Sequence, residues 1–187
     1  MIHFTSDTHW GHKNIIKYSN RPFSSVEEMD ETLINNWNAV VKPNDIVWHL
    51  GDFAFCDYKS FTQILRRLNG TKNVILGNHD KIITNNWDNL IDSKLLSSIQ
   101  YYKELKADGQ MIVLLHYPIA SWNKKHHGAI HLHGHCHASF VAPGKIVDVG
   151  VDDKRITSEY RPISIIDIIK YMKNIPDVAV DHHFNRE

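Results

Sequence analysis

The chain has 187 residues, of which 42% are apolar and 22% are charged, a composition that suits one globular domain with a buried core. Its 21 lysines and arginines balance 21 aspartates and glutamates, so no overall basic field would gather nucleic acid nonspecifically. No segment approaches the roughly 20 consecutive apolar residues of a membrane span, and the first residues lack the pattern of a secretion signal.

The two cysteines also indicate the cytosol, in agreement with the lack of a secretion-signal pattern. Cys56 and Cys136 are too few for a disulfide framework and lack the spacing of a thiolate metal site, which is typical of a reducing cytosol. We therefore expect a cytoplasmic protein. We also expect a single domain over residues 1–187, with a polar tail that frays from about residue 176.

The first part of the chain predicts a strand followed by a helix. Apolar Ile2 and Phe4 indicate a short opening strand. Ser25 and Glu28 then have the spacing of a capping box, and the apolar residues after them recur at helical intervals up to Pro43. This pattern predicts an amphipathic helix.

The next elements predict a parallel arrangement. Apolar runs at residues 45–50 and 73–76 each end in a glycine turn, which indicates two buried strands. Between them, apolar side chains at helical spacing predict a helix over residues 61–68 that ends at Gly70. A strand, helix and strand in this order favour a parallel sheet. Residues 80–96 show no clear pattern.

Four further apolar runs predict the strands of the second half. Residues 111–115 and 129–132 each run directly into histidines. Residues 145–149 and 163–166 are interpreted as late strands, and residues 167–173 as a helix. The predicted order is therefore that of an α/β protein.

The fourteen histidines are the most informative part of the composition, because imidazole is a frequent metal ligand and proton carrier. His49, His131 and His133 alternate with apolar residues in predicted strands, and we expect them to be packed and hydrogen-bonded. For the basic segment at residues 124–127, a solvated loop and the rim of a substrate site both remain open.

Polar side chains that can bind metals recur where predicted strands give way to loops. They are Asp7, His9, Asp52, Asn78, His79, His116, His135 and His137. Loops at the carboxyl ends of strands meet at one edge of an open α/β sheet, so these side chains are expected to form one cluster. Oxygen and imidazole ligands without thiolate suit manganese, iron, zinc, nickel or cobalt better than calcium.

In sequence order these residues form five motifs: Asp-Thr-His at 7–9, Gly-Asp at 51–52, Gly-Asn-His-Asp at 77–80, His116 after an apolar run, and Gly-His-Cys-His at 134–137. The set resembles the calcineurin-like metallophosphoesterases, and the resemblance spans residues 2–137 and continues to Asp148. It implies a sandwich of two mixed β-sheets flanked by helices, with a dinuclear metal site at the carboxyl edge of the strands. One departure is that Phe-Ala-Phe follows Asp52, where many members carry a polar or acidic residue.

The resemblance also implies a role for each residue of the motifs. One ion would be held by Asp7, His9 and His137 and the other by Asn78, His116 and His135, with Asp52 bridging both. Two divalent cations are the expected cofactors, with manganese favoured, and they would share a bridging hydroxide that attacks the phosphate. The resemblance implies that His79 faces the phosphate and either protonates the leaving oxygen or stabilises charge on the transferred group, and we expect Asp80 to orient its ring.

Two residues close to the first motif are candidates for substrate binding. Arg21 is interpreted as a bidentate contact to a substrate phosphate or as a member of a surface salt bridge. His12 is interpreted as a pocket residue or as a residue that caps or packs a helix start.

The implied function is hydrolysis of phosphoester bonds, with small phosphodiesters such as cyclic nucleotides favoured over phosphomonoesters. Nucleic acid is a less favoured substrate, no membrane partner is expected, and the oligomeric state is not predicted. One alternative is a noncatalytic metal-binding scaffold of the same fold, which the complete motifs around His79, His135 and His137 disfavour. The other is a nuclease, which would need a basic groove.

Overall fold

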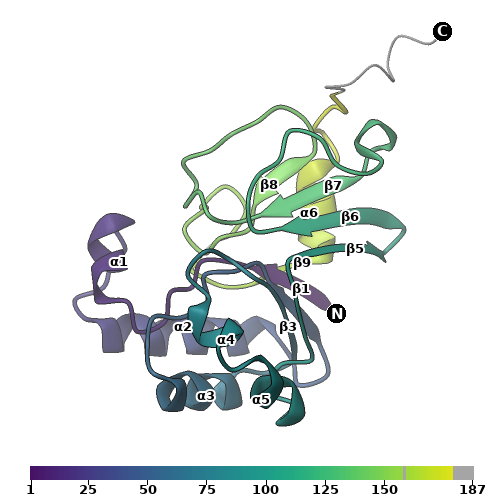
Figure 1. Cartoon of the computed structure of the whole chain (residues 1–187). Coiled ribbons are helices and arrows are strands. Elements are labelled where there is room, and N and C mark those ends of the chain that lie inside the picture. Colours follow the sequence, from purple (N-terminus) through teal and green to yellow (C-terminus); the bar gives the residue numbers. More distant parts are fainter. Residues whose placement is uncertain (158, 179–187) are drawn as a thin grey trace, which may run out of the picture.

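Two β-sheets face each other in the computed structural model, which describes residues 1–157 and 159–178 (Figure 1). The first has the strand order β4-β3-β2-β1-β9, and the second has the order β5-β6-β7-β8. The strands of the first sheet are β1 (Ile2–Thr5), β2 (Ile46–His49), β3 (Thr71–Ile75), β4 (Ser98–Gln100) and β9 (Ile163–Ser164). Those of the second are β5 (Tyr102–Ala107), β6 (Gln110–Leu115), β7 (Ile130–His133) and β8 (Ile146–Asp148).

Both sheets are mixed. In the first, β1 to β4 run parallel and β9 pairs antiparallel with β1. In the second, β5 and β6 are antiparallel, whereas β6, β7 and β8 are parallel. Helices flank the sheets, so the predicted sandwich of two mixed sheets is confirmed.

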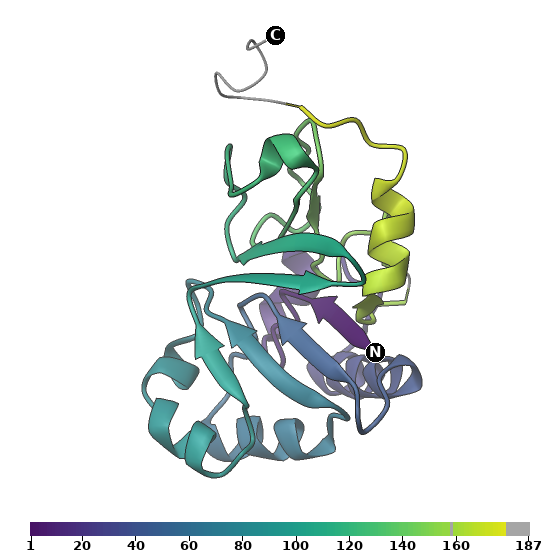
Figure 2. The same cartoon turned by 90° about the vertical axis from the view of Figure 1, so that its right-hand side faces the viewer.

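The helices are α1 (Lys13–Tyr18), α2 (Val26–Val40), α3 (Tyr58–Arg67), α4 (Lys81–Thr84), α5 (Trp87–Asp92) and α6 (Ile165–Met172), with a 3-10 helix at Lys125–His127. Helices α2 to α5 lie against the first sheet, α6 lies beside β9 and the second sheet, and α1 stands to one side (Figures 1 and 2). Apolar side chains of α2 and α3 pack against the first sheet, for example Trp37 and Phe61 with Val74. Among the described residues, no helix has the length and apolar character to cross a membrane.

The helix that begins after Ser25 forms as its capping pattern predicts. Ser25 Oγ accepts a hydrogen bond from the backbone N–H of Glu28 at 3.1 Å. The Glu28 carboxylate in turn accepts from the Ser24 N–H at 2.8 Å, one residue earlier than in a standard capping box. The side chains of Met29 and Leu33 are buried on the inner face of α2.

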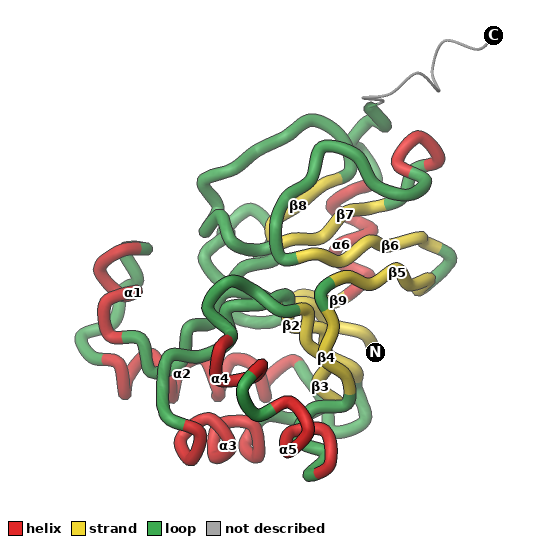
Figure 3. Tube along the Cα trace, in the orientation of Figure 1, coloured by secondary structure: helices red, strands yellow, loops and turns green. Residues whose placement is uncertain are grey.

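The register of the strands brings the loops of both sheets to one edge. Thr5 of β1 pairs with His49 of β2, which pairs with Val74 of β3, so these parallel strands end side by side. The loops after β1 and β2 stay joined, because the Asp7 N–H donates to the Gly51 carbonyl at 3.0 Å. Figure 3 shows the loops of both sheets gathered between the strands and α1.

The fold differs from the sequence prediction at residues 98–107 and 163–166. Strands β4 and β5 are present where no strand was predicted. The predicted strand at residues 163–166 is wrong beyond Ser164, because Ser164 Oγ accepts from the Asp167 N–H at 3.2 Å and thereby caps α6. The predicted frayed tail, including His182 and His183, lies mostly outside the described residues, which end at residue 178.

Candidate metal centre

The predicted side chains converge at the edge where the two sheets meet. They form two groups, Asp7 with His9 and His137, and Asp52 with His116 and His135, and within each group the nearest potential ligand atoms lie within 4.8 Å of one another. The carboxylate of Asp52 lies between the groups. Its Oδ2 is 3.9 Å from His9 Nε2 and 3.6 Å from His116 Nε2.

Asn78 completes the second group. Its side-chain oxygen lies 3.0 Å from His116 Nε2 and 3.0 Å from His135 Nδ1. All seven residues that the sequence places in the ligand set are therefore brought together. Their assignment as ligands remains a proposal.

Five of these seven residues have a left-handed backbone conformation, which non-glycine residues seldom adopt. They are Asp7 (φ 56°), His9 (φ 53°), Asp52 (φ 56°), His135 (φ 69°) and His137 (φ 45°). Such conformations cost free energy and concentrate at functional sites, where the surrounding structure holds them. Here they turn successive side chains of the short loops toward one place.

Two glycines permit the close approach of these loops. Gly51 has φ +96°, and a Cβ there would lie 2.6 Å from both Gly77 N and His116 Nδ1. A Cβ on Gly134 would overlap Ser6 Oγ and Asp7 Oδ2. Any larger residue would push the candidate ligands apart.

The polar atoms at the centre fit a bound cation. In the part of the chain that the structure describes, Asp7 Oδ1 and both ring nitrogens of His9 are buried and have no hydrogen-bond partner. Burial raises the pKa of the Asp7 carboxyl well above its usual value, and burial, with the neighbouring His137, lowers the pKa of His9 to about 2. A metal cation would compensate both groups, because it binds the carboxylate and the neutral imidazole.

A buried carboxylate fixes the orientation of His137. Asp152 Oδ2 lies 2.7 Å from His137 Nδ1, which leaves Nε2 facing Asp7 Oδ1 at 3.8 Å. Burial lowers the pKa of His137, but the hydrogen bond to Asp152 and the charges of Asp7 and Asp152 outweigh it, so this pKa is raised. A carboxylate on the far nitrogen of an imidazole is the usual support of a metal-binding histidine. Sequence reasoning missed Asp152, which lies three residues after a predicted strand.

Arg21 is not where either sequence interpretation put it. It is buried, and its Nε and Nη2 each donate to a carboxylate oxygen of Asp152 at 2.8 Å. The guanidinium also donates to the carbonyls of Asp7 at 2.7 Å and Thr8 at 2.9 Å. The predicted salt bridge is present but buried rather than at the surface. The predicted phosphate contact is wrong, because the guanidinium points into the protein and holds the loop of the first motif.

Asp80 also differs from its prediction. Its carboxylate accepts hydrogen bonds from the backbone N–H groups of Asp52 at 2.9 Å, Phe53 at 2.8 Å and Gly77 at 2.7 Å. No hydrogen bond joins it to the ring of His79 within the described chain. The expectation that Asp80 orients this ring is therefore wrong; instead, Asp80 fixes the two loops that carry Asp52 and Asn78.

A pocket of about 800 Å³ opens in front of both groups. The exposed His79 lines it, and its backbone N–H donates to Asp52 Oδ1 at 2.9 Å. His12 lines it as well, with its ring stacked on that of Phe55 at a centroid distance of 4.2 Å. His12 is thus a residue of the pocket, as one interpretation expected, and its contact with substrate remains a prediction.

The histidines predicted to pack inside the protein are buried and hydrogen-bonded. His49 Nε2 lies 2.8 Å from Thr8 Oγ1, His131 Nδ1 lies 3.1 Å from the Val113 carbonyl, and His133 Nδ1 lies 2.8 Å from the Gly134 carbonyl. In the basic segment, Lys125 is also buried, donates to the Ala120 carbonyl at 2.7 Å and lies over the Trp122 ring. Neither interpretation of that segment, a solvated loop or a substrate rim, describes Lys125.

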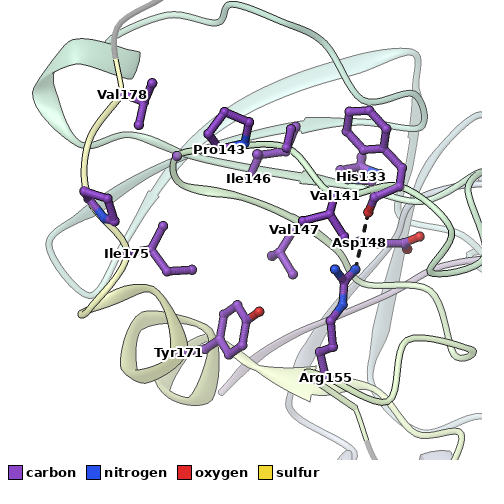
Figure 4. A pocket seen from close by; sticks show the side chains of 14 residues that line it. His133, Val141, Pro143, Ile146, Val147, Asp148, Arg155, Tyr171, Ile175 and Val178 are labelled. Atoms are coloured by element: carbon purple, nitrogen blue, oxygen red, sulfur yellow. Dashed lines mark hydrogen bonds between the residues drawn. The ribbon is translucent and has the colours of Figure 1, made fainter.

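A second pocket, of about 230 Å³, lies behind β8 (Figure 4). Apolar side chains such as Ile175 and Val178 surround one end, and His133, Asp148 and Arg155 lie at the other. The Asp148 carboxylate accepts from the N–H groups of Ala138 and Gly150 in the neighbouring loops. Its charge is therefore used to hold the loop of the last motif.

Comparisons with known proteins identify a matching family model and similar proteins. Residues 1–150 match the family model of the calcineurin-like phosphoesterase superfamily domain. The chain is 37% identical over 181 residues to an uncharacterized protein of Methanocaldococcus jannaschii, an alignment that covers 92% of this chain and 91% of that protein. It is 31% identical over 177 residues to the gene 66 protein of Mycobacterium phage L5, covering 80% of this chain and 85% of the phage protein.

The fold is likewise similar to that of a solved protein. A protein of unknown function from Aquifex aeolicus superposes with a TM-score of 0.67 and 27% sequence identity, covering 91% of this chain and 98% of that one. The family match includes all five motifs and both groups of candidate ligands. The chain therefore belongs to the calcineurin-like phosphoesterase superfamily.

Proposed function

We propose that the protein hydrolyses phosphodiesters of small, nucleotide-type alcohols with the help of two divalent cations, manganese being favoured. Asp7, His9 and His137 would hold one ion, Asn78, His116 and His135 would hold the other, and Asp52 would serve both. The observation that carries this proposal is the position of Asp52 Oδ2 between His9 Nε2 and His116 Nε2, at 3.9 and 3.6 Å.

Two divalent ions in such a site supply a hydroxide nucleophile at neutral pH and stabilise the charge that develops on the phosphoryl oxygens. The protein contributes only two carboxylates, Asp7 and Asp52, to this ligand set. The pocket next to the ions therefore keeps a positive potential that favours a phosphate group.

His79 is the proposed proton donor. It is the one histidine of the five motifs that belongs to neither ligand group, and it is exposed to the pocket. The hydrogen bond from its backbone to Asp52 ties it to the bridging position. A histidine placed there can protonate a departing alkoxide, which is worth about 10²–10⁴-fold in rate.

Two features support a small diester substrate. The pocket of about 800 Å³ has room for both ester arms of a phosphodiester. None of the described residues that line it is a lysine or arginine, which disfavours a long polyanion and hence the nuclease alternative. Both ligand groups and His79 are in place, which disfavours a noncatalytic scaffold.

Asp52→Asn tests the bridging role. The substitution removes the shared negative charge, so we expect loss of at least one ion per chain by elemental analysis, and loss of hydrolysis of bis-p-nitrophenyl phosphate. Asp88→Asn, an exposed position on α5, is the matched control and should keep both ions and normal turnover. A fully loaded and active Asp52→Asn variant would contradict the assignment.

His79→Ala should separate proton donation from metal loading. We expect two ions per chain and a fall in kcat of about 10²–10⁴ on diesters with an alkoxide leaving group, because an alkoxide needs a proton as it departs. With p-nitrophenolate the loss should be much smaller. His127→Ala, an exposed histidine outside the pocket, serves as control. Equal losses on both substrates, or loss of an ion, would refute the role of proton donor.

Arg21→Ala should destabilise the protein far more than a surface substitution does. It leaves Asp152 buried without its cation, which costs about 3–5 kcal/mol in the free energy of unfolding measured in urea. Arg67→Ala is the control, because its ion pair with Glu31 is exposed and worth only about 0–1 kcal/mol. Similar small losses for both variants would show that Arg21 does not anchor the loop.

A further inference from the structure

The two phenylalanines that follow Asp52 have different environments. Phe53 is fully buried, stacked on His49 at a centroid distance of 4.0 Å and packed edge-on against Phe61. Phe55 is 38% exposed and lines the pocket in front of the candidate ligands. Packing in the core therefore accounts for the presence of Phe53, but it does not account for that of Phe55.

Phe55 belongs to a series of three rings that contact one another and line the pocket. The ring of His12 stacks on it at 4.2 Å with an interplanar angle of 18°, and Tyr18 stands edge-on to His12 at 6.2 Å. Tyr18 is 72% exposed, and it also lines the pocket. We call the three residues Phe55, His12 and Tyr18 the aromatic wall.

The Phe55 end of the aromatic wall lies next to the candidate metal centre. The Phe55 ring is 5.4 Å from the ring of His9, a candidate ligand, and 4.9 Å from the ring of His79, the proposed proton donor. Tyr18 lies at the end of α1, two rings farther along. A group that rests on the wall would therefore be attached to a phosphate at the centre by a short spacer.

The same pocket also has polar lining residues. Ser19, Asn20 and Ser139 line it, together with His137 of the first ligand group. A substrate held here meets both aromatic rings and hydroxyl and amide groups. This combination suits a planar base joined to a hydroxyl-bearing sugar, because base–aromatic stacking and sugar hydrogen bonds need these two kinds of surface.

We propose that the aromatic wall is a nucleobase subsite, which stacks the base of a single nucleoside phosphate while its phosphoryl group lies at the metal centre. This inference rests on the proposed function and narrows its substrate class. If Phe55 served only to pack against His9, this role would not account for the second exposed aromatic ring in the pocket, that of Tyr18. The absence of lysine and arginine among the described pocket residues favours a single nucleotide over a polymer.

The test compares two ligands that share a phosphate and a pentose and differ in the base. Binding of AMP and of ribose 5-phosphate to the manganese-loaded protein is measured by isothermal titration calorimetry. The wild type should bind AMP roughly 5- to 150-fold more tightly, the range of one stacked base. Phe55→Ala should reduce this ratio at least fivefold, Phe55→Tyr should keep it, and Tyr101→Ala, an exposed aromatic outside the pocket, should leave it unchanged.

Two results would overturn the subsite. One is equal affinity of the wild type for both ligands; the other is a Phe55→Ala variant that weakens both ligands by the same factor, which would make Phe55 a support of the metal centre. If the manganese-loaded protein still hydrolyses bis-p-nitrophenyl phosphate in either case, only the subsite fails. If it neither binds these ligands nor hydrolyses any phosphoester, the proposed function fails together with the subsite.

Discussion

The buried carboxylate of Asp7 is the constraint on which the rest of the site depends. It lies at the junction of the two sheets with no exposed surface; Oδ2 accepts from the His135 N–H at 2.9 Å, and Oδ1 has no partner among the described residues. A buried and incompletely paired carboxylate is costly, and the cost is removed when a cation binds. The imidazoles of His9 and His137 face the same space, so a cation that pairs with Asp7 would also lie within their reach.

Other buried charges hold this arrangement in place. Arg21 joins the loop of the first motif to Asp152, and Asp152 joins it to His137 of the last motif. On the other side, Asp80 ties the loop of Asp52 to that of Asn78 through backbone N–H groups. These contacts help the chain to keep five candidate ligands in a strained left-handed conformation.

The sequence predicted those features that depend on local patterns. Asp7, Asp52 and His116 were placed correctly because each follows an apolar strand whose end can be read from its neighbours. The roles of Arg21 and Asp152 could not be read, because these partners are 131 positions apart and meet only in the folded chain. Strand β5 was missed because its sequence Tyr-Lys-Glu-Leu-Lys-Ala is mostly polar, as suits a strand at the edge of a sheet.

Anomalous diffraction from crystals of the manganese-loaded protein tests the central claim most directly. The account predicts two anomalous peaks roughly 3.5–4 Å apart on either side of the Asp52 carboxylate, one beside Asp7 and the other beside His116. A single peak at full occupancy, or peaks away from both groups, would contradict a two-metal centre.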